Sequence, residues 1–376
     1  MSGTINEHEF VVVLRGHSAA TFRQGTHIEV DQLQSSVGPV RAVYATRWLS
    51  RSDGVVLPGD LWIEVTGIGP SLEESLVPFA NAGFAVLPVI ALCTNAAVRD
   101  PEIELGFEST SGLRERDYFQ SYVPPEPETI HIRRHINVEV TLAAIRALGK
   151  HPEAERLRRG ANQYQIALDS WRLGIESLAL AHLWMAAEAI TKARIRIECT
   201  RRGIGDESSL ASALGVGLDQ LDPTVRKNLL LQGDEECYAK AKRASDGFEH
   251  GFLNYREINE RAKDVRHRMA KYVRTAILEM MDLDRKTFEA LISPPFDKPL
   301  GYWRIAKYFR GKLIGETDQL AAPGNAYPFM RWHPKITGTS VTPEGKLNIQ
   351  MSESFTAELA PGIQFQPGTI EAWRPD

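Results

Sequence analysis

The chain has 376 residues, and its 43% hydrophobic and 24% charged residues are the composition of an ordinary soluble globular protein. The formal net charge of -4 excludes an overall positive field that would draw the protein onto nucleic acid, so such a role would need a local basic surface. The three cysteines, Cys93, Cys199 and Cys237, are far apart and lack metal-ligand spacing, which indicates buried thiols in a reducing compartment.

The first residues and the apolar runs favour the cytoplasm. Glu7 and Glu9 lead into an apolar run, residues 10–14, that is too short for the core of a secretion signal. The longest apolar stretch, residues 84–93, contains Pro88 and is much shorter than a membrane span. We therefore expect a cytoplasmic protein that does not enter a membrane.

Residues 1–127 predict a mixed α/β domain, to which the sequence assigns no role. Runs rich in β-branched and aromatic residues predict strands at residues 10–14, 40–48, 61–65, 84–93 and 103–107. Ser71 and Glu74 have the spacing of a capping box, which predicts a helix that begins after Ser71. Three prolines then indicate a linker: Pro124, Pro125 and Pro127.

Residues 137–292 predict a helical bundle with antiparallel packing. Apolar residues recur every three or four positions over residues 164–185, which predicts one long helix. A shorter helix is expected over residues 206–215, and another over residues 222–244, with an Asp-Pro pair at its start. The last long helix begins near residue 255, again with a clear apolar stripe.

Residues 296–376 predict a short helix and a β-hairpin. The helix is expected over the aromatic-rich residues 302–309, and the hairpin strands over residues 337–341 and 347–351. The predicted fold class is therefore α+β, with a mixed α/β N-terminal domain, an all-α bundle and a short β tail.

The segment from Arg243 to His250 carries the strongest candidate chemistry. It is expected to form a turn between two helices, because Gly247 interrupts the helical pattern. A guanidinium binds a phosphate through two parallel hydrogen bonds, and an imidazole transfers a proton near neutral pH, so the pair could cleave a phosphodiester without a metal. The alternative is a structural turn in which His250 bonds to the backbone.

This arrangement resembles the HEPN superfamily (higher eukaryotes and prokaryotes nucleotide-binding domains) over about residues 160–285. The resemblance is carried by a long apolar helix at residues 178–193, connecting helices, and the Arg243-to-His250 segment followed by Gly251 and a further long helix. It implies either a metal-independent ribonuclease of toxin or phage-defence systems or a non-catalytic nucleotide-binding or scaffold protein. In a ribonuclease, Arg243 would stabilise charge on the phosphate of an RNA substrate and His250 would act as general base or acid, at the interface of a homodimer.

Two acidic residues are candidates for the same site. Asp246 would supply a polar group inside the segment. Glu188 lies in the apolar run 183–190, where a buried carboxylate needs a partner. Its functional interpretation is a pair with Arg243 or a position beside His250. Its structural interpretation is a core ion pair with an arginine of a neighbouring helix, or a carboxylate at the margin of the apolar stripe.

Basic residues after the central helix and along the last one form a candidate RNA-binding surface. Those chosen as nucleic-acid contacts are Arg194, Arg196, Arg266, His267 and Lys271. In the last helix they fall off the apolar stripe, so they are expected to face water and to follow a phosphate backbone. The alternative is an ordinary solvated helix face offset by acidic residues.

Histidines 131 and 135, with Glu139 four residues further on, would share one face of a helix and could then bind a metal. Alternating apolar residues between 130 and 140 favour a strand instead, with both histidines on its outer face. We therefore expect neither a metal nor a cofactor. Two functions stay open: a homodimeric endoribonuclease, and a non-catalytic module that binds a nucleotide or a protein.

Overall fold

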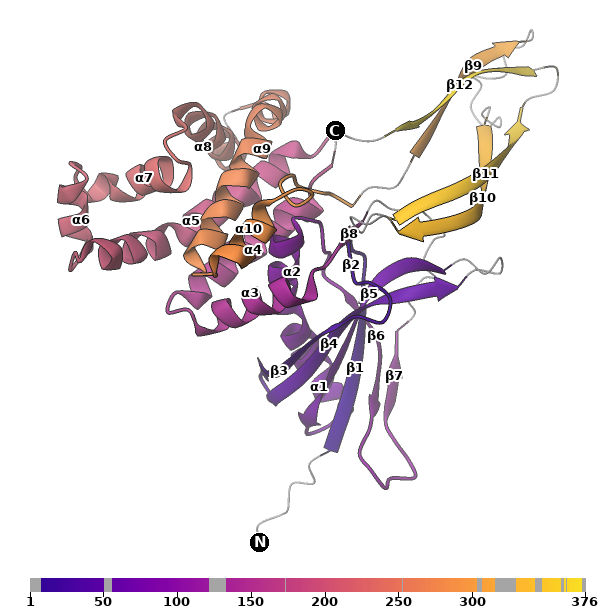
Figure 1. Cartoon of the computed structure of the whole chain (residues 1–376), viewed down its shortest axis with the longest axis horizontal. Coiled ribbons are helices and arrows are strands. Elements are labelled where there is room, and N and C mark those ends of the chain that lie inside the picture. Colours follow the sequence, from indigo (N-terminus) through magenta and orange to yellow (C-terminus); the bar gives the residue numbers. More distant parts are fainter. Residues whose placement is uncertain are drawn as a thin grey trace. The chain divides into compact units, whose positions relative to one another are not determined.

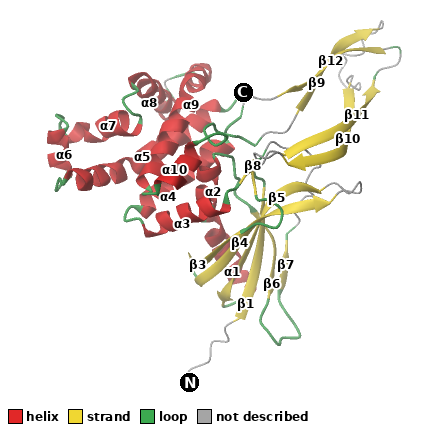
Figure 2. Ribbon diagram, in the orientation of Figure 1, coloured by secondary structure: helices red, strands yellow, loops and turns green. Residues whose placement is uncertain are grey.

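The computed structural model describes residues 8–50, 56–121, 133–172, 174–251, 253–302, 306–314, 329–341, 347–359, 362 and 364–373. The chain divides into two compact units. The first comprises Met1–Arg47, Gly59–Glu126 and Arg133–Tyr302, and the second comprises Trp48–Pro58, Pro127–Ile132 and Trp303–Asp376. The first unit combines a β-sheet with helices (Figure 2), so the predicted α+β class is confirmed at this level.

A six-stranded antiparallel sheet forms one part of the first unit (Figure 1). Its strands, in spatial order, are β3 (Ile28–Ser35), β4 (Gly38–Ser50), β5 (Val56–Gly69), β1 (His8–Gly16), β6 (Glu102–Glu108) and β7 (Tyr118–Gln120). Side chains alternate across each strand, so Phe10, Val12 and Leu14 of β1 lie on one face and are fully buried. Four of the five predicted strand segments lie in this sheet, and only residues 84–93 do not.

Two helices follow β5 and belong to the core. Helix α1 (Leu72–Phe84) begins at the predicted N-cap, since Ser71 accepts a hydrogen bond from the Glu74 N–H at 3.3 Å. It is anchored to the sheet where the buried Tyr44 hydroxyl donates to the Gly83 carbonyl at 2.9 Å.

Residues 84–93, predicted as a strand, form helix α2 (Leu87–Thr94) instead. Every residue of α2 is buried, so its sequence has no apolar periodicity that distinguishes a helix from a buried strand.

By length and composition, Leu72–Thr94 is the one segment of the described residues apolar enough to cross a membrane. Within its most apolar window, 67% of the residues are buried inside the protein. The packing of α1 and α2 in the core accounts for this composition.

Residues 138–292 are helical, as the apolar periodicity predicts. The helices are α3 (Val138–Lys150), α4 (Ala154–Asp169), α5 (Glu176–Arg202), α6 (Glu207–Ala213), α7 (Leu221–Val225), α8 (Glu235–His250), α9 (Tyr255–Met280) and α10 (Arg285–Ile292). A short 3₁₀ turn, Leu218–Gln220, precedes α7, and a π-helical turn, Arg226–Leu230, follows it. The helices predicted over residues 206–215 and from residue 255 are confirmed, with Asp206 and Asn254 as their N-caps.

Two predicted helices are each divided in the structure. The helix expected over residues 164–185 is broken between α4 and α5, where Gly174 adopts a left-handed φ of 87°. The helix expected over residues 222–244 is broken by Gln232 and Gly233, both with positive φ. The apolar stripe continues across both breaks because the helices on either side pack on the same core.

Two arginines, the buried Arg274 and the half-buried Arg134, bind carbonyl groups at the end of α2. Arg274 of α9 is 3% exposed and donates to four carbonyl oxygens, those of Leu92, Cys93, Leu291 and Phe296, at 2.7 to 3.1 Å. Arg134 donates to the carbonyls of Thr94 and Asn95 at 3.1 and 2.7 Å. Both cations therefore satisfy carbonyl groups at the C-terminal end of α2, where the helix dipole favours positive charge.

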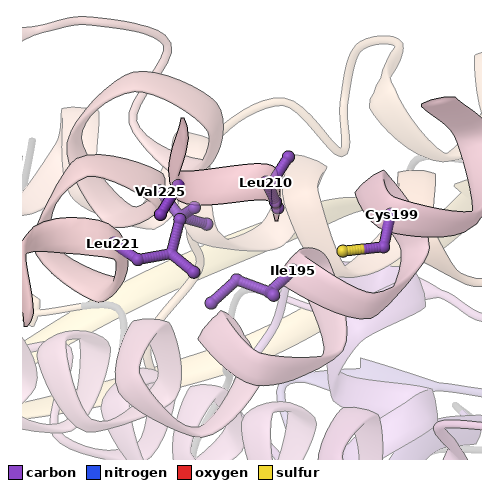
Figure 3. Packing of buried hydrophobic residues seen from close by; sticks show 6 residues of the cluster. Ile195, Cys199, Leu210, Leu221 and Val225 are labelled. Atoms are coloured by element: carbon purple, nitrogen blue, oxygen red, sulfur yellow. The ribbon is translucent and has the colours of Figure 1, made fainter. Parts of the chain in front are cut away.

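The end of α5, with α6 and α7, forms a small projection with its own core. Figure 3 shows Ile195 and Cys199 of α5 close to Leu210, Leu221 and Val225, and all of them are buried. Helix α5 ends at Gly203, whose φ of 66° allows the chain to turn back towards α6.

The second unit contains two antiparallel strand pairs. Strand β10 (Phe329–Val341) pairs with β11 (Leu347–Glu358), with Val341 opposite Leu347, so the predicted hairpin is confirmed. Strand β9 (Ala306–Ile314) pairs with β12 (Gln364–Trp373). Residues 306–309 are therefore strand, and the prediction of a short helix over 302–309 is wrong there. The two aromatic residues Tyr308 and Phe309 are adjacent, so the sequence lacks the alternation that indicates a strand.

Candidate functional site

Arg243 and His250 both lie in α8, which continues through Gly247 to His250 and ends at Gly251 with a φ of 68°. The prediction of a turn in this segment is wrong. Gly247 serves packing rather than chain reversal, because a Cβ at this position would lie 2.5 Å from the Leu253 side chain. Glycine therefore lets the chain after α8 pass close to the helix.

Arg243 and His250 share one exposed face of α8. Seven residues correspond to two helical turns, so both side chains project in nearly the same direction, about 10 Å apart along the axis. Both residues are exposed, whereas Ala244 and Ser245 on the opposite side are buried. Neither Arg243 nor His250 forms an ion pair within the described residues. Both side chains are therefore accessible to solution.

Asp246 is engaged elsewhere on the same helix. Its carboxylate binds the Lys242 ammonium group at 2.7 Å, an i to i+4 pair. This hydrogen bond raises the pKa of Lys242. Asp246 therefore neutralises a neighbouring lysine rather than Arg243 or His250.

Glu188 pairs with an arginine of a neighbouring element, as its structural interpretation required. Its carboxylate accepts from Arg226 at 2.9 Å, and its side chain is 45% exposed, so Glu188 lies at the margin of the apolar stripe rather than in the core. Trp184, one turn earlier on α5, packs on Tyr238 with ring centroids 5.6 Å apart. Tyr238 lies three turns before His250, about 18 Å along the axis of α8. The structure thus does not bring Glu188 beside His250.

The predicted RNA-binding residues do not form one exposed surface. Arg194 lies 3.6 Å from the Glu279 carboxylate, Arg196 binds Glu153 at 3.0 Å, and Lys271 is exposed. Their charges are partly offset by these acidic partners, as the alternative interpretation of a solvated helix face required.

Arg266 is buried against Trp171 instead of facing water, whereas His267 contacts the same ring and remains exposed. The Arg266 guanidinium lies 5.0 Å from the centre of the Trp171 ring and 4.0 Å from the Glu176 carboxylate. His267 contacts the ring edge-on at 5.0 Å, and partial burial, with the positive charges of Arg266 and Lys298, lowers its pKa. The expectation of a water-facing side chain is wrong at Arg266, because α9 packs against α4, α5 and α8.

The region of the two neighbouring histidines does not resemble a metal site. Residue 131 lies outside the described residues, and Arg134–His135 form the short strand β8, which pairs with β2 (Ala20–Thr21). Glu139 belongs to α3, which begins after the cap at Asn137, so it shares no element with His135. Across the described ranges, no group of three or more His, Cys, Asp or Glu could hold a metal ion.

Sequence reasoning missed a histidine–carboxylate pair in the sheet part. The His17 Nδ1 atom lies 2.7 Å from Asp60 Oδ1, and the Asp60 side chain is 1% exposed. The two residues are 43 positions apart and no local motif links them. Only an aspartate next to the apolar start of β5 indicates a buried carboxylate that needs a partner.

Comparison with protein-family models, with curated proteins and with solved structures returned no match.

Proposed function

We propose that this protein is a homodimeric, metal-independent endoribonuclease in which Arg243 and His250 carry the chemistry, as the HEPN resemblance implies. The observation that supports the proposal is the position of both side chains on one exposed face of α8. An RNA phosphate that approaches this face meets a cation and a proton carrier together.

The proposed reaction needs only these two groups. His250 takes the proton from a ribose 2′-hydroxyl, and the 2′ oxygen forms a bond to the adjacent phosphorus. The bond from phosphorus to the 5′ oxygen of the next nucleotide breaks, that oxygen takes up a proton from water, and His250 returns its own proton to solvent. Arg243 stabilises the negative charge that develops on the phosphate oxygens. The products are a 2′,3′-cyclic phosphate end and a 5′-hydroxyl end.

The spacing along α8 favours a site shared between two protomers. If two α8 helices meet antiparallel across a two-fold axis near Asp246 and Gly247, Arg243 of one copy lies opposite His250 of the other. The separation of about 10 Å within one helix is then replaced by a direct approach between the copies. A cytoplasmic location and a role in a toxin or phage-defence system belong to the same proposal.

A non-catalytic role, in which α8 binds the phosphate of a nucleotide or mediates dimerisation, is the second candidate. The pairing of Asp246 with Lys242 and of Glu188 with Arg226 favours it. With both carboxylates engaged, neither orients the His250 ring as a carboxylate does in a catalytic histidine pair.

Cleavage of a mixed-sequence, fluorescently labelled RNA in the presence of EDTA separates the two candidates. The ribonuclease proposal predicts products with 2′,3′-cyclic phosphate ends and their loss in His250→Ala and Arg243→Ala. His27→Ala and Arg256→Ala change exposed residues outside α8 and should cleave as the wild type does. Binding without cleavage by the wild-type protein would support the second candidate and contradict the first.

A further inference from the structure

The His17–Asp60 pair lies beside a second cation, Arg99. Ser18 and Val98 form an antiparallel bridge, and the Arg99 N–H donates to the His17 carbonyl at 3.0 Å, so His17 and Arg99 are opposite one another across the two segments. Opposite residues of an antiparallel pair project to the same side, with Cβ atoms about 5 Å apart. The imidazole and the guanidinium can therefore reach one ligand.

Each of the two side chains is oriented by its own carboxylate. Asp60 holds His17 through Nδ1, and Asp169 of α4 accepts from Arg99 Nε at 2.5 Å. The Tyr302 ring lies over both, 5.5 Å from the His17 ring and 5.3 Å from the Arg99 guanidinium carbon. The His17 and Arg99 side chains remain 41% and 34% exposed. The site is thus fixed on one side and open to solution on the other.

The charge around Asp60 determines which imidazole nitrogen faces a ligand. Burial alone would raise the pKa of Asp60, but the hydrogen bond from His17 and the positive charges of His17, Arg15 and Arg133 outweigh it and lower that pKa. Asp60 is therefore a carboxylate that only accepts, and His17 donates through Nδ1. When His17 is protonated, its Nε2 also carries a proton and is a second donor.

We propose that His17 and Arg99 bind a terminal phosphate group. The two terminal guanidinium nitrogens of Arg99 and the protonated Nε2 of His17 supply three directions of N–H donors, and a phosphomonoester presents three terminal oxygens to accept them. A carboxylate has only two oxygens and one negative charge, so it matches the site less well. This site depends on none of the α8 residues and stands apart from the proposed ribonuclease chemistry.

The contribution of His17 to binding should fall as pH rises, since neutral His17 keeps its proton on Nδ1 for Asp60 and presents an unprotonated Nε2 to the anion. The charged and titratable groups that face the site are Asp60 of β5, Arg15 of β1, Arg133, Arg99, Tyr302 and Asp169 of α4. Among side chains an imidazole is the one that ordinarily changes charge near neutral pH, and a phosphate group loses its second proton in the same range. Comparison with a variant that lacks the imidazole therefore isolates the contribution of His17.

Titration of inorganic phosphate into the full-length protein, followed by NMR of the histidine Cε1–H signals, tests the proposal. At pH 6 the His17 signal should shift and saturate, while the signal of exposed His27 stays in place. At pH 6 the wild type should bind phosphate at least about tenfold more tightly than His17→Gln, and at pH 8 about equally, because the charge of phosphate itself cancels in each comparison. Equal shifts of both histidines, or the same ratio of affinities at the two pH values, would overturn the proposal.

Two variants and one competing anion complete the test. Arg99→Met should weaken phosphate binding at least about tenfold, whereas Arg159→Met, which removes an exposed arginine paired with Glu155, should not change it. If loss of the Asp169 contact unfolds Arg99→Met, His17→Gln on the wild-type Arg99 background gives the same readout by calorimetry. Wild-type affinity in the folded variants, or acetate bound as tightly as phosphate, would contradict a phosphate site.

Discussion

Arg243 and Arg274 carry the same side chain on neighbouring helices, yet their surroundings give them opposite roles. Arg274 is buried and donates to four carbonyl oxygens that belong to three separate segments of the chain. Arg243 is exposed on α8 and has no ion pair within the described residues. Burial and hydrogen-bond partners, not residue type, therefore distinguish a cation that holds the fold from one that is exposed to solution.

The largest expected effect follows from removal of the buried cation. Arg274→Met should lower the free energy of unfolding by about 3–5 kcal/mol, because four carbonyls lose a charged donor in a buried region. Arg243→Met should change it by less than about 0.5 kcal/mol. Urea unfolding measures both. Similar losses in the two variants would contradict the distinction between the buried and the exposed arginine.

Tyr164 tests the same region, the end of α2, through an uncharged side chain. Its buried hydroxyl donates to Asn95 Oδ1 at 2.7 Å, directly beside the carbonyls that Arg134 and Arg274 hold. Tyr164→Phe should cost about 1–2 kcal/mol in urea unfolding, since the amide oxygen then lacks its donor. Tyr118→Phe removes an exposed hydroxyl of β7 that donates to Gln120 and should change little. If Tyr164→Phe leaves the free energy of unfolding unchanged, the packing around the end of α2 does not depend on the hydrogen bond to Asn95.

Asp234 links α8 to α9 and should make stability depend on pH. Burial opposes its ionisation, but the bonds from the Cys237 N–H and Tyr272 and the charge of Arg268 prevail and lower its pKa below the ordinary 3.8. A lowered pKa in the folded state contributes stability that is present above the unfolded value and is lost as pH falls through the folded value. Asp234→Asn should therefore cost about 1 kcal/mol at pH 7 and reduce the loss of stability below pH 4. Unchanged acid unfolding would show that Asp234 contributes nothing to it.

The smallest effect is expected at Glu188. Its carboxylate is 45% exposed in the ion pair with Arg226, so Glu188→Gln should change stability by less than about 1 kcal/mol. RNA cleavage by this variant should match the wild type, because Glu188 does not lie beside His250. A large loss of cleavage with an intact fold would instead assign Glu188 a role in tuning the site.

The regular part of the fold can be predicted from local pattern, as the strands around Phe10, Tyr44 and Ile63 and the N-caps at Ser71 and Asp206 show. The local sequence pattern does not predict the structure where a segment is buried on all sides, or where the break between two helices is short. Helix α2 is buried on all sides, and the breaks at Gly174 and at Gln232 and Gly233 interrupt stripes that keep their periodicity. The prediction of a helix over residues 302–309 is wrong at residues 306–309, because these residues pair with a strand far along the chain.

The candidate site was predictable only in part. The sequence indicates Arg243 and His250 as a pair, but their common exposed face depends on α8 continuing through Gly247. The close contact with Leu253 explains why this position is a glycine. The partner of Glu188 depends on helix packing, and so does the burial of Arg266, whereas Asp246 pairs with Lys242 within α8. His17, Arg99 and Asp60 come together only through strand pairing across large separations, so no local motif marks them.

RNA cleavage by mixed dimers tests most directly whether α8 carries a ribonuclease site shared by two protomers. Arg243→Ala and His250→Ala proteins would be unfolded together, refolded as an equal mixture, and assayed in EDTA. Each variant alone should be inactive, and the mixture should recover about a quarter of wild-type cleavage, because half of the dimers are mixed and each of those has one intact site. An inactive mixture of folded dimers beside an active wild type would contradict the shared site, and an inactive wild type would contradict the ribonuclease itself.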